Sequence, residues 1–474
     1  MPPMVNTIID WVSTNIPPWL WILLVCHFAI LGTVAYLILL ERKVASWVQD
    51  RLGPNRVGLG FGIIPIIKNW HMGGLGQPLA DGVKFILKED YRPAGVDKVL
   101  FTLAPGAMIL MVIVSIAVLP WGGTYQSQKT ITVPATATDV TAYAGTQIPL
   151  GSSIVGDPTP VGITGNQYTI TYQCSFQIAK LNIGVLFILA VLSLTVYGVV
   201  IGGWASNNKY SFLGGLRATA NMISYEIPMG LSVLCIVLMF GTLQLDEIVK
   251  AQLHNWAGIV PAWNVFSQPL AFVMFLICIH AEANRAPFDM AEAEQELVGG
   301  YHTEYSAMRF ALFFLAEYAG MITTSAVLVA LFFGGWDFPG LRGPANDPAL
   351  STSLIICIAR SLVFFIKTVV VIFVFMWVRW SLPRFRFDQL MMLAWRALIP
   401  MSLALLLMTA IVLTIFHGNI SDGRASLSLL LANIAMMIVF GVVSTWIPAA
   451  PATNRKLKVL GSRYSKTPLP AELN

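Results

Sequence analysis

The sequence predicts an all-α membrane protein, a polytopic transmembrane helix bundle with about nine spanning helices and an interfacial amphipathic helix on the cytoplasmic side. Hydrophobic residues make up 56% of the 474 residues and charged residues only 11%, and the mean hydropathy is +0.71. Because soluble domains carry about 25% charged residues, this composition excludes a soluble globular protein. The length of the apolar runs and the placement of Lys and Arg define the spans and their direction.

Nine apolar runs are long enough, or nearly so, to cross the roughly 30 Å of hydrocarbon in a bilayer. The fifth has the shortest uninterrupted core. The runs cover residues 19–40, 99–121, 181–201, 222–243, 265–283, 310–335, 352–378, 392–416 and 427–450.

The basic residues are distributed unevenly between the two sides. Of 29 Lys and Arg residues, 22 fall in the segments on one side and five on the other, and Arg360 and Lys367 lie within the seventh run. Cytoplasmic loops carry the excess of basic residues in membrane proteins. We therefore expect an external N-terminus and a cytoplasmic C-terminus.

Two segments between the runs have patterns of their own. In 77–90 the apolar residues share one helical face, which predicts a helix lying in the membrane interface. The external segment 122–180 alternates Thr and Val between Gly and Pro, which indicates a small β-hairpin cap or an irregular loop.

The chain lacks the residue patterns of a redox or metal centre. Its five cysteines contain no CxxC pair and its six histidines no HExxH-like spacing. We expect no flavin, iron–sulfur cluster or metal to be bound by this chain, and no complete catalytic site in it alone.

An acidic window stands between the fifth and sixth runs. Six of the 24 acidic residues lie between Glu282 and Glu304, against one basic residue, Arg285. If 289–297 is helical, Asp289, Glu292 and Glu296 share a face, and such close carboxylates titrate as a group. The window is therefore a candidate for proton handling, although charge runs are more often solvated loops.

Five ionisable residues fall in or at the ends of the apolar runs. A charge at the bilayer centre costs about 2.5–3.5 kcal/mol on insertion scales, so such residues are candidates for function. Three acids cannot pair completely with two bases, which favours a polar path over purely structural ion pairs. The five are Glu226, Glu282, Glu317, Arg360 and Lys367.

Five motifs together resemble one family, the membrane-embedded H subunit of proton-pumping NADH:quinone oxidoreductase, respiratory complex I. The resemblance covers most of residues 19–416. The motifs are ERKVASWVQDRLGPNRVG (41–58), QPLADGVKFILKED (77–90), KYSFLGGLRATANMISYEI (209–227), AEANRAPFDMAEAEQELVGGYHTEYSAMRFALFFLAEY (281–318) and PRFRFDQLMMLAWRALIP (383–400).

The resemblance implies a subunit that forms the quinone portal and part of the quinone chamber and couples quinone reduction to proton translocation. The implied substrate is a quinone, ubiquinone or menaquinone. The implied partners are the hydrophilic-arm subunits at the quinone site, one of them carrying the terminal iron–sulfur cluster, with small membrane subunits, antiporter-like subunits and lipids. No nucleic acid is expected, and the implied location is the bacterial plasma (inner) membrane.

The motifs also imply roles for individual residues. A proton relay would use Glu226, Glu282, Asp289, Glu292, Glu294, Glu296, Glu304 and Glu317. The quinone portal and chamber would use Arg51, Arg56, Asp81, Lys84, Arg217 and Arg285.

The chain departs from the family pattern in four places. About ten residues are inserted between 58 and 77, the external loop is long, and Asn221 stands where the family has Gln. We expect residues 1–426 to form the family-like membrane domain, with the external insert 122–180 and a cytoplasmic coupling loop 284–309. Residues 427–474, the fourth departure, would add a further transmembrane helix and a basic tail.

Two other functions remain open from the residues. The chain could be the homologous subunit of a related complex, such as a membrane-bound hydrogenase or a dehydrogenase with another donor. It could also be a stand-alone cation antiporter, although no inverted repeat is detectable in the sequence.

Overall fold

The structure is a computed structural model that describes residues 18–58, 72–133, 153–155, 157–160, 167–256, 260–290, 298–344, 347–416 and 423–446. Two compact units are distinguished, residues 1–433 and 434–474. The arrangement described below is that of the first unit.

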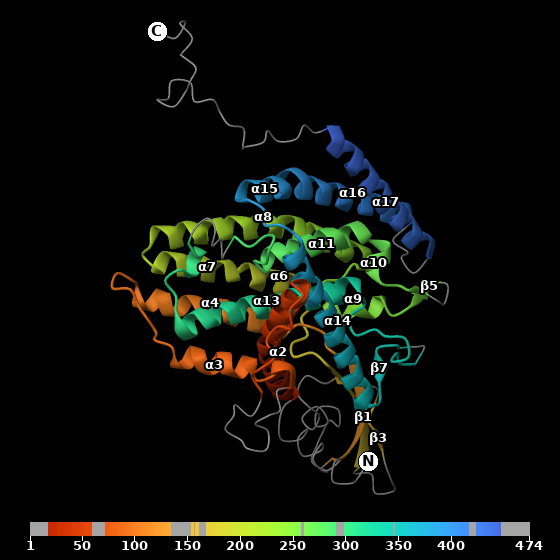
Figure 1. Cartoon of the computed structure of the whole chain (residues 1–474). Helices are drawn as coiled ribbons and strands as arrows, with labels where there is room; N and C mark the ends of the chain where they lie inside the picture. Colours follow the sequence, from red (N-terminus) through yellow and green to blue (C-terminus); the bar gives the residue numbers. More distant parts are fainter. Residues whose placement is uncertain are drawn as a thin grey trace, which may run out of the picture. The chain divides into compact units, whose positions relative to one another are not determined.

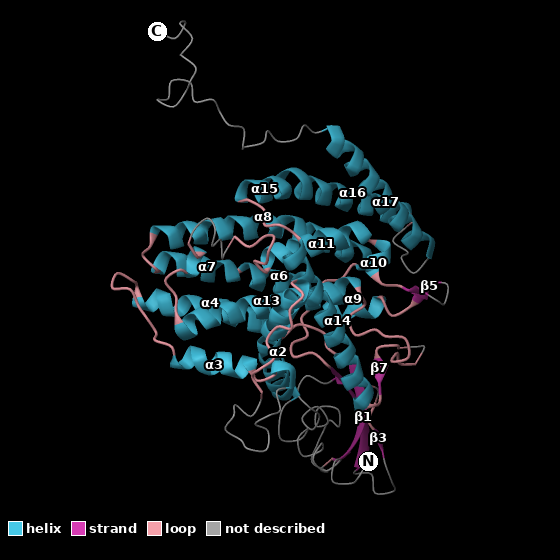
Figure 2. Ribbon diagram, viewed as in Figure 1, coloured by secondary structure: helices cyan, strands magenta, loops and turns pink. Residues whose placement is uncertain are grey.

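Long helices dominate the described chain (Figures 1 and 2). Among the described residues, seven helical segments are long and apolar enough to cross a membrane, which confirms the predicted all-α class. The long helices are α2 (Pro18–Val48), α4 (Lys98–Ile116), α6 (Gly184–Ser193) with α7 (Thr195–Ala205), α8 (Lys209–Phe240), α11 (Pro269–Glu282), α13 (Ala307–Phe332), α14 (Leu354–Ser381), α16 (Ile399–Ile415) and α17 (Gly423–Trp446).

Each predicted apolar run coincides with one of these helices. The fifth run forms α11, which at 14 residues is shorter than the seven candidate spans. The fourth run was expected at 222–243, but α8 begins at Lys209, so Glu226 lies in mid-helix. Asn208 accepts a hydrogen bond from the Tyr210 N–H and begins α8 early, since a capped polar first turn can precede the apolar part of a helix.

Short elements connect the long helices. The interfacial helix expected in 77–90 is α3 (Gln77–Leu87), whose Leu79, Val83, Ile86 and Leu87 are exposed. The remaining helical elements are η2 (Met72–Gly74), α9 (Leu245–Ala251), α10 (Asn264–Ser267), η3 (Gly300–His302), α15 (Phe387–Met392) and the π-helical η4 (Leu393–Leu398).

Segment 122–180 was expected to form a β-hairpin cap or an irregular loop, and its described residues form antiparallel strands. Strands β1 (Thr124–Thr132) and β4 (Gln167–Ser175) pair antiparallel along nine residues each. They belong to one sheet with the short strands β2 (Ser153–Ile154), β3 (Thr159–Pro160) and β7 (Leu350–Ser351), and a separate pair is formed by β5 (Asn255–Trp256) and β6 (Val260–Pro261).

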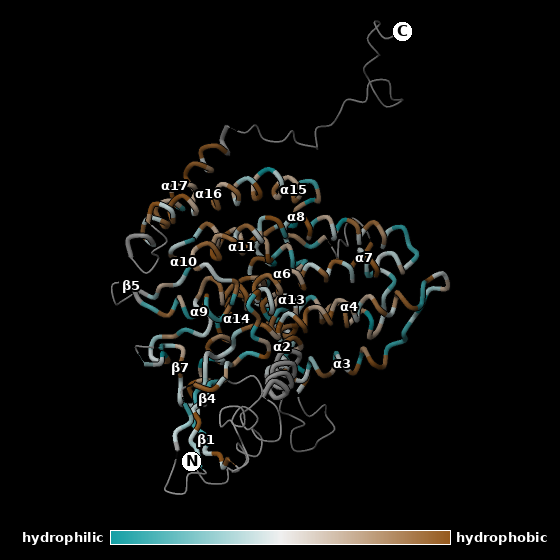
Figure 3. The backbone as a smooth tube through the Cα atoms, turned by 180° about the vertical axis from the view of Figure 1, so that it is seen from behind, coloured by the Kyte–Doolittle hydropathy of each residue, from teal (hydrophilic) through white to brown (hydrophobic). Residues whose placement is uncertain are grey.

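Helix α13 is the central element. It packs against α2, α3, α4, α11 and α14, and 78% of its apolar window is buried. Hydrophobic residues follow the long helices, while hydrophilic ones gather at the connections and along the hairpin (Figure 3). The close approach of α8 to η3 depends on glycine, because a Cβ on Gly214 would lie 2.8 Å from Gly300.

Candidate functional site

A cavity of about 730 Å³ opens between α2, α3 and α13. Its wall is mostly apolar, but one side carries polar groups from α2, α3, α13 and α14. Ligand cavities of this size combine an apolar lining with a few convergent polar groups. The polar and charged lining residues include Glu41, Arg42, Asp81, Tyr318 and Arg379.

Glu41 joins this cavity to the protein interior. The Tyr318 hydroxyl and the Arg379 guanidinium both donate hydrogen bonds to its carboxylate. Arg285 Nη1 lies 3.6 Å from Glu41 Oε2, and the Arg285 guanidinium lies 4.0 Å from the centre of the Tyr318 ring. Because Glu41 and Arg285 are buried, their opposite charges stabilise each other and hold this wall in one arrangement.

A second acid lies on the same helix as Tyr318. Glu317 is buried in α13, accepts a hydrogen bond from the Tyr301 hydroxyl at 3.2 Å, and interacts electrostatically with Arg285, Asp289 and Arg379. Since Arg285 faces both Glu41 and Glu317, it links the cavity to the acids farther inside.

Glu317 and Glu282 share the wall of a small cavity of about 20 Å³. Thr195, Asn284 and Thr324 complete its polar lining. A space of roughly 10–15 Å³ or more with several polar partners is enough for one water molecule. The two carboxyl groups are therefore placed around a site that could hold a bridging water.

Glu226 extends this group of acids into α8. It is half-buried, lies close to Ser193, and interacts electrostatically with Glu282 at the end of α11. One carboxyl oxygen of each residue has no hydrogen-bond partner among the described residues. A buried carboxyl oxygen without a hydrogen-bond partner costs free energy and is therefore rare. Where such oxygens occur, the site typically binds water or exchanges protons.

The remaining predicted acids divide into two groups. Asp289 lies outside any helix and pairs with Arg384 at 2.7 Å, while Glu304 accepts a hydrogen bond from Asn208 at 2.6 Å. Glu292, Glu294 and Glu296 lie outside the described residues, so the helix expected over 289–297 is described only at its first two positions, which are not helical.

Comparisons with known proteins identify the family of this chain. The sequence model described as NADH dehydrogenase matches residues 21–410.

The chain belongs to this family.

It is 43% identical over 376 residues to an H subunit of the NADH-quinone oxidoreductase of Cytophaga hutchinsonii, a match that covers 79% of this chain and 91% of that protein. It is 42% identical over 404 residues to the corresponding H subunit of Leptospira biflexa, covering 85% and 96%. It is 41% identical over 396 residues to that of Flavobacterium psychrophilum, covering 83% and 97%. These matches confirm the resemblance to the H subunit of complex I, and the apolar helices agree with a multi-pass membrane protein.

The residues that the family resemblance assigned to the portal lie in different places. Asp81 lines the large cavity, and Arg285 lies behind it at Glu41. The cavity wall among the described residues does not include the other four. Arg51, Arg56 and Lys84 are exposed, and Arg217 is half-buried with its guanidinium 5.3 Å from the centre of the Phe387 ring.

The polar and charged cavity residues missed from the sequence include Glu41, Arg42, Tyr318 and Arg379. Glu41 lies two turns before the end of α2, Arg379 lies in the last turn of α14, and Tyr318 lies beside Glu317 in α13. Glu41 follows the first apolar run directly, so counting charges just outside each run would have found it. Nothing in the sequence predicts that its partners are Arg285 and Arg379.

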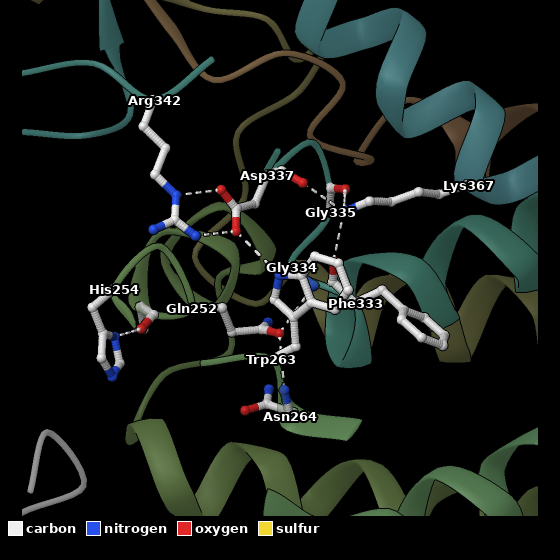
Figure 4. A network of polar contacts seen from close by, with 11 residues as sticks. Gln252, His254, Trp263, Asn264, Phe333, Gly334, Gly335, Asp337, Arg342 and Lys367 are labelled. Atoms are coloured by element: carbon white, nitrogen blue, oxygen red, sulfur yellow. Dashed lines mark hydrogen bonds and ion pairs between the residues drawn. The ribbon is translucent and has the colours of Figure 1, made fainter. Parts of the chain in front are cut away.

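The two cations of α14 do not join the acids of the site. Lys367 Nζ donates to the carbonyls of Phe333, Gly335 and Asp337 at 2.7–3.0 Å (Figure 4). The Arg360 guanidinium donates to carbonyls of residues 341, 348 and 349. Both cations therefore hold the loop between α13 and α14 in place. This supports a structural role for them, through backbone carbonyls and not through the ion pairs with buried acids that the sequence offered as the alternative.

A wider polar network surrounds Lys367. Arg342 forms two hydrogen bonds with Asp337, both of 2.6 Å, and the Trp263 indole N–H donates to the same carboxylate (Figure 4). Gln252 Oε1 accepts from the Gly334 N–H at 3.0 Å. The network holds the C-terminal end of α13 and so supports the helix that carries Glu317.

His302 lies between α11 and α13, outside the spanning helices. Its ring makes edge contacts with Tyr301, Phe310 and Phe314. Burial lowers the pKa of His302 to about 4, although the nearby Asp289 opposes this shift. The imidazole is therefore neutral at pH 7. The described residues contain no group of three His, Cys, Asp or Glu side chains that could hold a metal ion.

Proposed function

We propose that this membrane subunit of an NADH-quinone oxidoreductase admits a quinone into the 730 Å³ cavity and couples its reduction to proton translocation. The observation that carries the proposal is the continuity of charged groups between the cavity and the interior. Glu41 lines the cavity, Arg285 interacts with both Glu41 and Glu317, and Glu317 and Glu282 both line a small second cavity.

The chemistry of the cavity suits an amphipathic quinone. Apolar side chains from α2, α3 and α13 would contact the tail and ring, while the polar side offers hydrogen-bond donors to quinone oxygens. Electrons would come from an iron–sulfur cluster in a partner subunit of the hydrophilic arm. The described residues of this chain supply binding, orientation and charge.

Quinone reduction would be linked to proton translocation through neighbouring carboxyl groups, whose protonation states depend on one another. A reduced quinone carries negative charge or draws protons, and this changes the field at Arg285 and Glu317. Carboxyl groups with few charge partners in a buried site respond to such a change by taking up or releasing protons. Glu317, Glu282 and Glu226 would pass this response inward, with Asp289, Glu304 and the acids 292, 294 and 296 supplying protons from the cytoplasmic side.

The cavity is tested by filling it. Ala311 of α13 lines the cavity, and Leu312 beside it does not. Ala311→Trp should lower quinone reductase activity of the assembled complex at least tenfold, while electron transfer from NADH to a water-soluble acceptor in the hydrophilic arm persists. Leu312→Trp adds bulk to the same helix and should keep more than half of the activity. Equal activity of the two variants would reject the cavity as the quinone site.

The relay is tested by removing one proton-accepting group. Glu317→Gln keeps the side-chain volume and should depress quinone reduction and proton translocation together. Glu247, an exposed acid of α9, provides the matched control because Glu247→Gln removes the same charge at a position that does not line the cavity. A Glu317→Gln complex that pumps at the wild-type rate would reject the relay.

The proposal also includes the orientation of the chain in the membrane, with the N-terminus outside and the C-terminus in the cytoplasm. It rests on the 22 to 5 distribution of Lys and Arg between the two sides. Reporter fusions at residues 150 and 470 should lie on opposite sides of the plasma membrane, with residue 470 in the cytoplasm. Both reporters on one side would reject it.

A further inference from the structure

Helix α3 forms one wall of the large cavity although it is weakly attached. None of its eleven residues is buried. Ile86 lines the cavity and is 68% exposed, so α3 forms a thin wall at this point. A wall this thin, with an apolar outer face, is where a lipid-soluble ligand could pass.

Both ends of α3 are tethered to the rest of the protein. At its start the Gly76 N–H donates to the Val57 carbonyl at 3.2 Å. Beyond its end, Asp90 pairs with Arg309 at 3.1 Å, and the Tyr91 N–H donates to Ser306 Oγ at 3.0 Å. The helix is therefore a strap that can roll or lift between two fixed ends.

One ion pair holds the middle of this strap against α2. Arg42 Nη1 lies 2.7 Å from Asp81 Oδ2, and Gln77 Nε2 donates to the other carboxylate oxygen at 3.1 Å. Arg42 and Asp81 both line the cavity, so the pair spans its wall. The Arg42 side chain is 48% exposed, and exposed pairs are weak, so this contact can break and reform readily.

We propose that Arg42 and Asp81 are positioning residues that latch α3 across the side of the cavity, and that a quinone passes between membrane and cavity only when this latch opens. The inference rests on the proposed function, because it assumes that the cavity is the quinone site. The ion pair then controls admission of the quinone and leaves the chemistry of its reduction unchanged.

The first test uses kinetics of the assembled complex with the quinone extracted from the native membrane. Asp81→Asn and Arg42→Gln should each change the quinone KM at least threefold and kcat less than twofold. Exchanging the charges, with Arg42→Asp and Asp81→Arg together, should return KM to within twofold of wild type. Lys88→Gln is the control, since it removes a charge beside α3 without touching the cavity. An exchanged variant that resembles the single variants would reject the latch.

The second test closes the latch after assembly, so folding of the variant is not at issue. Arg42→Cys with Asp81→Cys is joined by a short bifunctional thiol reagent that a reductant cleaves. Of the native cysteines among the described residues, Cys235, Cys278 and Cys357 are buried and Cys174 is half-buried. Each single cysteine variant, treated in the same way, controls for modification alone.

Cross-linking should lower quinone reduction at least tenfold, and cleavage of the cross-link should restore it, while electron transfer to the water-soluble acceptor stays constant. A cross-linked complex that reduces quinone as fast as the cleaved form would overturn the proposal. The two hypotheses fail separately: an Ala311→Trp complex of normal activity rejects the cavity, whereas an inhibited one with no cross-linking effect rejects only the latch.

Discussion

Glu41→Gln tests whether the ion cluster behind the cavity is required in the arrangement seen here. The substitution keeps the volume of the side chain but removes the negative charge that Arg285 and Arg379 share. Arg285 is only 3% exposed, so water cannot replace the lost partner. Removing one member of a buried pair costs about 3–5 kcal/mol.

The structure places the effect near the lower end of that range. Arg379 is partly exposed and can be hydrated, and Glu317 also interacts with Arg285. A loss of about 3 kcal/mol corresponds to roughly a 100-fold change in an equilibrium or rate. Quinone-dependent kcat/KM should therefore fall between tenfold and 100-fold, with electron transfer to a water-soluble acceptor unchanged.

A double-mutant cycle separates the charge effect from general damage. Arg379→Gln removes one of the two cations, so the combination Glu41→Gln with Arg379→Gln leaves fewer unbalanced charges than Glu41→Gln alone. The double variant should regain about 1–2 kcal/mol relative to additivity, because neighbouring charges are coupled. Effects that add to within about 0.5 kcal/mol would show that the cluster does not act as a unit, and would refute this reasoning.

Three further predictions concern other parts of the chain. Joining Thr132 to Gln167, which pair in register, through an Asn-Gly turn should keep quinone reduction within twofold in an assembled complex, and a larger loss would assign the distal hairpin a role in activity. Lys367→Met should destabilise the protein by about 2–3 kcal/mol, because three carbonyls lose a charged donor. The rate of thermal inactivation should rise while the quinone KM stays unchanged. An altered quinone KM with an unchanged inactivation rate would instead assign Lys367 to the functional site. Since the folded pKa of His302 is about 4, below its ordinary value of 6.5, acid favours protonation of the unfolded chain and stability is lost as pH falls from 6.5 toward 4. Between pH 7 and 5 this amounts to about 2 kcal/mol, and melting temperatures of the wild type and His302→Asn should converge on acidification; parallel curves would contradict it.

Part of this molecule could be predicted from the sequence because the bilayer acts on each residue independently. Transfer into hydrocarbon depends on local composition, so the nine apolar runs mark the helices without knowledge of their neighbours. Alternation likewise gave a β-hairpin as one of two possibilities for the segment that contains β1 and β4, and amphipathic spacing predicted α3. The motifs placed Glu282 and Glu317 in an acidic group, and those two residues line one small cavity.

What the tertiary structure decided is which charges meet. Glu41 is separated from Tyr318 by 277 positions and from Arg379 by 338, yet all three lie together at one cavity wall. The sequence also treated Arg360 and Lys367 as companions of the buried acids, whereas both bind carbonyls of the loop between α13 and α14. Helices of similar hydropathy can pack in many orders, and an ion pair forms only where packing brings two side chains within a few ångströms. Sequence alone therefore determines that charges must be buried in this membrane bundle, and the fold determines how they are paired.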